Sequence, residues 1–74
     1  MELVDVARFM LVSDAAILES ILTGENIEYS LNHQNSSILL PGSGSILSVR
    51  KPDERRVREI IKESGFEKDL LPER

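Results

Sequence analysis

The sequence lacks cysteine and tryptophan, and its 74 residues include one histidine, one tyrosine and two phenylalanines. Without cysteine, neither a disulfide nor a thiolate metal site can form, and a single histidine is too few for a zinc cage. The scarcity of aromatic side chains also argues against a sheet that stacks nucleic-acid bases. We therefore expect no metal, no cofactor and no covalent cross-link in this chain.

Long apolar stretches and N-terminal basic residues are missing as well. Residues 1–5 contain two acids and no base, whereas a secretory signal places basic residues ahead of a long apolar segment. No apolar run approaches the roughly 20 residues that a membrane-spanning helix needs. We therefore expect a cytoplasmic protein that has no membrane partner.

Acidic residues outnumber basic residues by 13 to 9, and the charge is unevenly distributed. Residues 1–37 hold six acids and one base, whereas residues 38–74 hold seven acids and eight bases, which gives net charges of −5 and +1. Because the phosphate backbone repels an acidic chain, nucleic acid is not the expected partner. The basic residues of the second half keep a nucleic-acid-binding domain as the alternative.

The remaining composition is 41% apolar and 30% charged, which is typical of a folded chain rather than a disordered one. A chain of 74 residues is expected to form one domain. The core of a domain this small supplies only about 3–5 kcal/mol of net stability. Because disulfides and metals cannot add to it, we expect self-association or a partner to do so.

The first half of the chain predicts a strand followed by a helix. Residues 6–12 form an apolar run that is short for a helix and typical of a buried strand. Ser13 and Asp14 then supply an N-cap and a first-turn acid, and Gly24 stands where a C′ glycine ends a helix. The helix between them has an apolar stripe at helical spacing, formed by Ile17, Leu18, Ile21 and Leu22.

The second half predicts two more strands and a second helix. Residues 27–31 alternate apolar and polar side chains, and residues 46–49 form a short strand-like run after a turn at residues 41–44. Pro52 opens the second helix at or near its first turn, and Gly65 ends it. The apolar stripe of this helix consists of Val57, Ile60 and Ile61.

The order of these elements predicts the fold class. Strand, helix, strand, strand and helix, joined by short right-handed connections, favour an α+β fold of the α-β plait or ferredoxin-like type. In this plait, residues 1–65, the first and third strands are adjacent and both helices cover one face. The tail, residues 66–74, is expected to pack against it or to be partly ordered. Because a fourth strand is missing, the first strand lies at an edge that a second copy or the tail could cover, and we expect a homodimer or small homo-oligomer.

Three segments of the chain resemble one bacterial family. They are Phe9-Met10-Leu11-Val12-Ser13 followed by Ala15, Leu18 and Leu22; Gly24-Glu25-Asn26-Ile27; and Ser48-Val49-Arg50-Lys51-Pro52-Asp53-Glu54. Over residues 7–64 the chain is similar to domain-of-unknown-function family two-thousand-seven, whose members are described as prokaryotic signal-transducing proteins. The resemblance implies an α-β plait like that of GlnB, the PII nitrogen-signalling protein, and places residues 32–45 where PII has its partner-binding loop. The turn glycine after the first helix is shifted in this chain, and the tail after Gly65 has no counterpart in the family.

The first candidate site is the polar stretch formed by His33, Gln34 and Asn35. As a catalytic base, His33 would need an orienting carboxylate and a substrate pocket, and an exposed loop histidine is the more common situation. Gly42 and Gly44 lie in a stretch that lacks the lysine and the third glycine of the phosphate-binding motifs. We therefore interpret residues 33–35 as a ligand or partner contact and the glycine stretch as a turn.

The second candidate site is the group of basic residues around the start of the second helix: Arg50, Lys51, Arg55 and Arg56, with Arg58 beyond them. They suit an anionic ligand or an acidic partner, although Asp53 and Glu54 would compete with a phosphate for the first-turn amides. The other interpretation is a solvated surface with partial self-pairing, in which Arg55 pairs with Glu59. Arg8 lies in an apolar strand, and its side chain either points to the uncovered face of the sheet or pairs with an acid across an interface.

Taken together, these patterns predict a regulatory or interaction module that binds a protein or a small metabolite without turning it over. A catalytic triad would need a second histidine, and no set of convergent polar residues suits another reaction, so we expect no enzyme. The alternative is a nucleic-acid-binding plait that uses the basic edge at residues 50–58. The net negative charge of the chain and its few aromatic residues disfavour that alternative.

Overall fold

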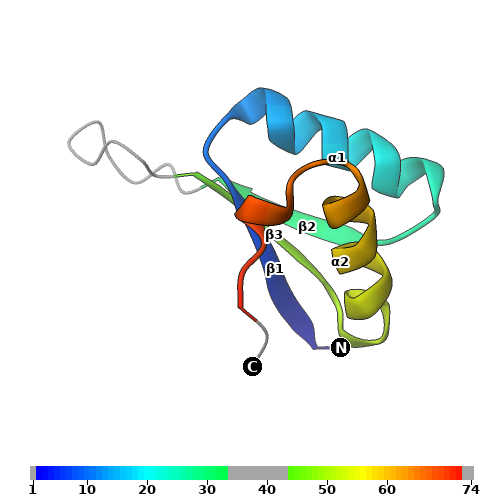
Figure 1. Cartoon of the computed structure of the whole chain (residues 1–74). Coiled ribbons are helices and arrows are strands. Elements are labelled where there is room, and N and C mark those ends of the chain that lie inside the picture. Colours follow the sequence, from blue (N-terminus) through cyan, green and yellow to red (C-terminus); the bar gives the residue numbers. More distant parts are fainter. Residues whose placement is uncertain (1, 34–43, 73–74) are drawn as a thin grey trace.

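The structure, a computed structural model, describes residues 2–33 and 44–72, with the side chain of His33 left out. The element order is β1 (Leu3–Phe9), α1 (Val12–Gly24), β2 (Tyr29–His33), β3 (Ser45–Arg50), the 3-10 turn η1 (Lys51–Asp53), α2 (Glu54–Glu63) and the 3-10 turn η2 (Glu67–Asp69). The predicted order of strand, helix, strand, strand and helix is therefore confirmed. The fold is α+β, with one sheet and two helices that pack on it (Figure 1).

The three strands form one antiparallel sheet in the order β1-β3-β2. β3 lies in the centre and runs from Ser45, opposite Phe9, to Arg50, opposite Leu3. The predicted adjacency of the first and third strands is confirmed. Cross-strand partners share a face of the sheet, so Val4, Val49 and Tyr29 point to one side and Arg8, Ile46 and Asn32 to the other.

Both helices pack against β1 and β3 and close a single core (Figure 1). The fully buried side chains come from all of these elements and include Val6, Phe9, Leu18, Leu22, Leu47, Val49, Val57 and Ile61. The ring of Phe66 packs edge-on against the ring of Phe9, with centroids 5.8 Å apart. The apolar stripes predicted for the two helices therefore supply much of this core, although Ile17 is exposed.

The first strand lies earlier in the chain than predicted. Residues 6–12 were expected, but β1 comprises Leu3–Phe9 because β3 offers no partner beyond Ser45, which faces Phe9. Met10, Leu11 and Val12 are apolar and yet 53%, 60% and 72% exposed. The strand prediction was therefore wrong for these three residues, whose apolar character does not reflect burial.

The helix α1 also begins earlier than predicted. Its first residue is Val12, its N-cap position is Leu11, and no side chain caps it. Ser13 was expected to be the N-cap, but it lies inside the first turn, so that prediction was wrong. Asp14 does lie in the first turn, where an acid interacts favourably with the helix dipole.

At the end of α1, Gly24 does not take the C′ position that we expected. It is the last helical residue, and the left-handed residue is Asn26, with a φ of 59°. The N–H of Ile27 donates to the Leu22 carbonyl at 2.9 Å, and the N–H of Asn26 donates to the Thr23 carbonyl at 3.1 Å. These two bonds form a Schellman motif, and asparagine tolerates its left-handed position.

The end of α2 uses the same motif with glycine. Gly65 has a φ of 91°. Its N–H donates to the carbonyl oxygen of Lys62 at 3.1 Å, and the N–H of Phe66 donates to the carbonyl oxygen of Ile61 at 3.0 Å. Gly65 therefore ends the second helix as predicted. The turn also directs Phe66 back toward the core, where it packs against Phe9.

The other element boundaries differ by a few residues from the expected ones. β2 comprises Tyr29–His33 rather than residues 27–31, because Ile27 closes the end of α1 instead of pairing with β3. β3 is one residue longer at each end than the predicted 46–49. Pro52 lies in η1, directly before α2, where its missing N–H costs no helical hydrogen bond.

The tail folds back onto the outer edge of β1 (Figure 1). Leu70 lies opposite Ala7 in an antiparallel bridge, and the N–H of Leu71 donates to the carbonyl oxygen of Val6 at 2.9 Å. The register of β1 with β3 skips Val6, which indicates a β-bulge at this residue. The tail therefore pairs with β1 at the bulge. In the described part of the chain, no helix is long and apolar enough to cross a membrane.

Candidate functional site

The candidate site is a groove beside the N-terminal half of β1, with a volume of about 610 Å³. One wall consists of residues 2–5, the other consists of Lys51, Glu54 and Arg58, and one end is closed by Leu71 and Pro72. We refer to it as the edge groove. It exists because α2 crosses beside β1 and because the tail returns to the same strand.

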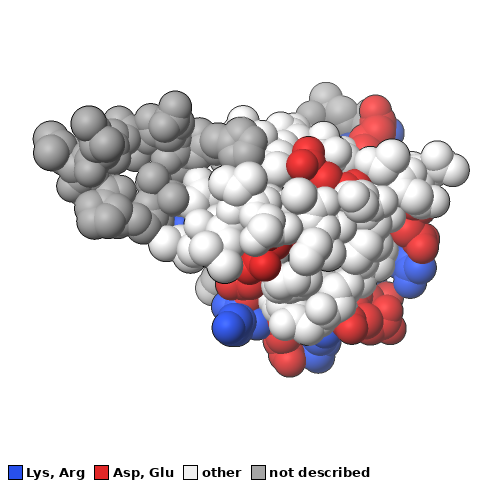
Figure 2. All heavy atoms as spheres, turned by 90° about the horizontal axis from the view of Figure 1, so that it is seen from above, with Lys and Arg blue, Asp and Glu red and all other residues white. Residues whose placement is uncertain are grey.

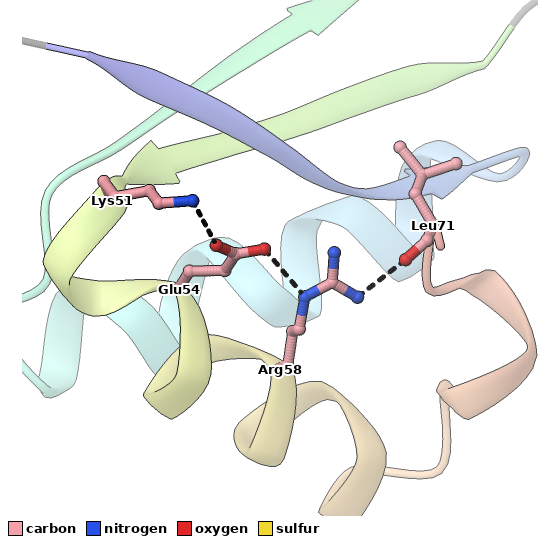
Figure 3. A network of polar contacts seen from close by, with 4 residues as sticks. All are labelled: Lys51, Glu54, Arg58 and Leu71. Atoms are coloured by element: carbon pink, nitrogen blue, oxygen red, sulfur yellow. Dashed lines mark hydrogen bonds and ion pairs between the residues drawn. The ribbon is translucent and has the colours of Figure 1, made fainter. Parts of the chain in front are cut away.

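Three charged side chains form the α2 wall of the edge groove (Figure 3). The carboxylate of Glu54 lies 3.2 Å from Nε of Arg58 and 3.7 Å from Nζ of Lys51. Nη1 of Arg58 donates to the carbonyl oxygen of Leu71 at 2.6 Å. Figure 3 shows these four residues in one chain of contacts between α2 and the tail.

The three charges differ in how far solvent reaches them. The side chains of Glu54 and Arg58 are only 17% and 14% exposed, whereas that of Lys51 is 64% exposed. Hydrogen bonds to charged groups are stronger when solvent is largely excluded. Glu54 and Arg58 therefore form a fixed part of the wall, and Lys51 is the charge of this wall that a ligand can reach.

The predicted basic site does not form one surface. Arg50 ends β3, and its Nη1 lies 2.6 Å from Glu28, while Nη2 of Arg56 lies 3.2 Å from Glu25. Only Lys51 of the four predicted residues lines the edge groove. On the face shown in Figure 2, basic and acidic side chains lie next to each other rather than in separate areas.

Arg55 lies on the exposed side of α2, away from the edge groove. The expected ion pair between Arg55 and Glu59 does not form in the described part of the chain; the pair of this spacing on α2 is Glu54 with Arg58. The two pairs lie on different faces of the helix. Glu54 and Arg58 face β1 and the tail, where they are partly buried, whereas Arg55 and Glu59 face solvent.

The other predicted site is only partly described. His33 is the last residue of β2 and pairs with Ser45 of β3, so the expectation of a loop position was wrong for its backbone. Gln34 and Asn35 lie outside the described residues. The backbone of His33 lies on β2, the edge strand opposite β1, and so does not border the edge groove.

Arg8 lies on the face of the sheet that the helices leave uncovered. It is exposed, whereas its neighbours Ala7 and Phe9 are buried. On the same face, Oγ of Ser48 donates to Oδ1 of Asp5 at 2.6 Å. The structure thus places Arg8 on the uncovered face of the sheet, and pairing with an acid across an interface stays a prediction.

Glu54 is the site residue that the sequence did not predict as such, and Arg58 was noted only beyond the predicted basic group. Their spacing of four residues on one helix was an available signal, but it does not indicate which pair faces the groove. The contribution of Leu71 depends on the return of the tail to β1. Among the described residues, no group of three histidine, aspartate or glutamate side chains is arranged to hold a metal ion.

In comparisons with known proteins, no protein-family model, curated protein or solved structure matches the chain.

Proposed function

We propose that this protein is a non-catalytic regulatory or interaction module that binds a protein segment or a small metabolite in the edge groove. The observation that carries the proposal is the groove itself, a space of about 610 Å³ in which the described residues place an exposed cation, Lys51, beside a fixed ion pair. Its volume falls within the range of about 300–1,000 Å³ that is typical of ligand sites.

The chemistry of the α2 wall supports binding. Glu54 interacts with two cations, Lys51 and Arg58, so the α2 wall carries one positive charge in excess and faces the carboxylates of Glu2 and Asp5 on the β1 wall. Arg58 also holds Leu71 at the end of the groove. A wall that is already fixed loses little conformational entropy when a ligand binds, which favours affinity.

We also propose that the sheet and its two helices are an α-β plait similar to that of GlnB, and that the protein acts in prokaryotic signalling in the cytoplasm. The strand order β1-β3-β2 and the single core that both helices share support the plait. The signalling role rests on the family resemblance of residues 7–64. A nucleic-acid-binding plait is not favoured, because Arg50 and Arg56 are paired with acidic residues.

A homodimer or small homo-oligomer stays a prediction. The prediction was based on the open edge of the first strand, and the tail pairs with part of this edge at Val6 and Ala7. Light scattering at micromolar concentration tests it. A second copy doubles the measured mass, whereas a single-chain mass contradicts the prediction.

A thermal-shift screen against nucleotides, 2-oxo acids, amino acids and short peptides tests the proposed function. A ligand at a hundred times its Kd adds about 2.7 kcal/mol, which raises the Tm of a domain this small by about 10 °C. The Lys51→Gln variant should lose most of this shift, because Lys51 is the accessible cation of the groove. The matched Arg55→Gln variant, with the same loss of charge outside the groove, should keep it, and equal losses in both variants would contradict the proposal.

A further inference from the structure

The backbone of β1 presents unpaired groups to the edge groove. The N–H of Lys51 donates to the carbonyl oxygen of Glu2 at 3.4 Å, which continues the ladder between β1 and β3. Hydrogen-bonded and non-hydrogen-bonded pairs alternate along an antiparallel ladder. Glu2 and Val4 therefore direct their backbone groups toward β3, whereas Leu3 and Asp5 direct theirs toward the outer edge.

The described part of the tail, which ends at Pro72, pairs with β1 only at Val6 and Ala7. In the part of the chain that the structure describes, no backbone hydrogen bond from outside the sheet reaches Leu3 or Asp5. Both residues line the edge groove, so two N–H and two C=O groups face a space that is open to a ligand.

We propose that the occupant of the edge groove is an extended peptide segment of a partner protein, which adds to the sheet as a strand beside Leu3, Val4 and Asp5. This inference rests on the proposed function and specifies its ligand. Backbone hydrogen bonds to a free sheet edge supply affinity in this mode of recognition, and side-chain pockets supply specificity. The arrangement of a strand edge, a facing helix and a closed end suits such a segment better than a compact metabolite.

A second copy of the chain fits this edge less well than a separate peptide does. A two-fold pairing of two β1 strands that uses both Leu3 and Asp5 places Glu2 of one copy opposite Val6 of the other. The edge at Val6 is already occupied by Leu71. The tail of each copy would therefore meet the β1 strand of the other, whereas a peptide can end before it reaches the tail.

The groove also indicates the side chain that the peptide carries. A residue added opposite Val4 shares the face of Val4 and points toward the α2 wall. There, Lys51 and Arg58 lie beside the carboxylate of Glu54, and the exposed Glu2 adds a second carboxylate to the lining. Because Glu54 already pairs with Arg58, the exposed Lys51 is the group with which an acidic side chain at this position would pair. The flanking residues lie beside Asp5 and beside Leu3, which is apolar and 50% exposed.

Two capped seven-residue peptides test this proposal on the full chain. Both alternate threonine and valine, and one has a central glutamate where the other has a central lysine. On titration, the glutamate peptide should shift the amide NMR signals of Leu3 and Asp5 and slow their hydrogen exchange. It should bind about two- to fivefold more tightly than the lysine peptide, as expected for a partly exposed ion pair, and this difference should shrink as salt is added.

Removing backbone donors separates strand pairing from other modes of binding. The glutamate peptide can carry N-methyl groups either on its odd-numbered or on its even-numbered residues. One of these two methylated peptides should bind at least tenfold more weakly than the unmethylated peptide, because it loses the N–H groups that pair with β1. The Leu3→Pro variant should show a similar loss, because proline is tolerated at a strand edge whose N–H faces outward. The Leu3→Ala variant keeps the N–H and is its matched control. If Leu3→Pro does not fold, the methylated peptides alone decide the question.

The outcomes distinguish this inference from the proposed function. If peptides or metabolites shift the signals of Lys51 and Arg58 but not those of Leu3 and Asp5, and both N-methyl peptides bind as well as the parent, the added strand is overturned and the groove function stands. If no compound or peptide moves any signal of the edge groove, both proposals fail. Loss of binding with one methylation register and with Leu3→Pro supports the added strand.

Discussion

Nη1 of Arg58 donates a hydrogen bond of 2.6 Å to the carbonyl oxygen of Leu71, so a side chain of α2 holds the tail on the outer edge of β1. The same guanidinium pairs with Glu54 through Nε. One residue thus connects the helix, the tail and the edge groove. This connection has a measurable consequence for stability.

The Arg58→Ala variant should lower the free energy of unfolding by about 1.5–3 kcal/mol, the range for hydrogen bonds that involve a charged group. It should also expose the tail, so that the amide of Leu71 loses protection in hydrogen exchange. Urea unfolding gives the first quantity. Arg55→Ala is the control, since this exposed residue should contribute less than about 0.5 kcal/mol, and equal effects of both substitutions would contradict the role of Arg58.

Gly24 and Gly65 should respond in opposite directions to substitution by alanine. Gly24 is helical, and a Cβ built there meets no atom within 4 Å, so Gly24→Ala should raise stability by about 0.4–1 kcal/mol. Gly65 has a φ of 91°, a region that costs other residues about 1–2 kcal/mol, so Gly65→Ala should lower stability by that amount. Urea unfolding of both variants checks the assignment, and a loss at Gly24 would contradict it.

Gly44 allows a close approach of two chain segments. A Cβ at this position would lie 2.5 Å from the carbonyl oxygen of Phe9, a backbone atom with little freedom to move. Gly44→Ala should therefore lower stability by about 1–3 kcal/mol, as overpacking does. Thermal unfolding measures the effect, and an unchanged Tm would show that the chain near Gly44 moves aside without cost.

The apolar residues after β1 should tolerate polar substitution. Leu11 is 60% exposed, so Leu11→Gln should change the free energy of unfolding by less than about 0.5 kcal/mol. Phe9, two residues earlier, is fully buried, and Phe9→Ala should cost about 3–5 kcal/mol. Circular dichroism should find Leu11→Gln folded and Phe9→Ala largely unfolded. If Leu11→Gln unfolded the protein and Phe9→Ala did not, the strand would extend to residue 12, as the apolar run alone predicted.

Much of the fold follows from local patterns in the sequence. Helical spacing identifies Leu18, Leu22, Val57 and Ile61 as core residues, and all four are buried. The end of β1 does not follow from such a pattern, because Met10 is as apolar as residues inside the strand. The length of the strand is set by its pairing with β3, which is a contact between distant segments.

The candidate site could be predicted only in part. Lys51 was identified from the density of basic residues near the second helix, and it lines the edge groove. The groove itself depends on the pairing of Leu70 with Ala7 and on the bulge at Val6. Neither contact has a local signal, because each arises when the tail returns to a strand formed by the other end of the chain.

The claim that the edge groove is the binding surface is tested most directly by an amide-resolved NMR titration of the full chain with the strongest compound or peptide from the thermal-shift screen. The largest shifts should come from Leu3, Asp5, Lys51 and Arg58, and Lys51→Gln should reduce them while Arg55→Gln leaves them unchanged. Shifts that centre instead on α1 or on Arg8 and the uncovered face of the sheet would contradict the claim.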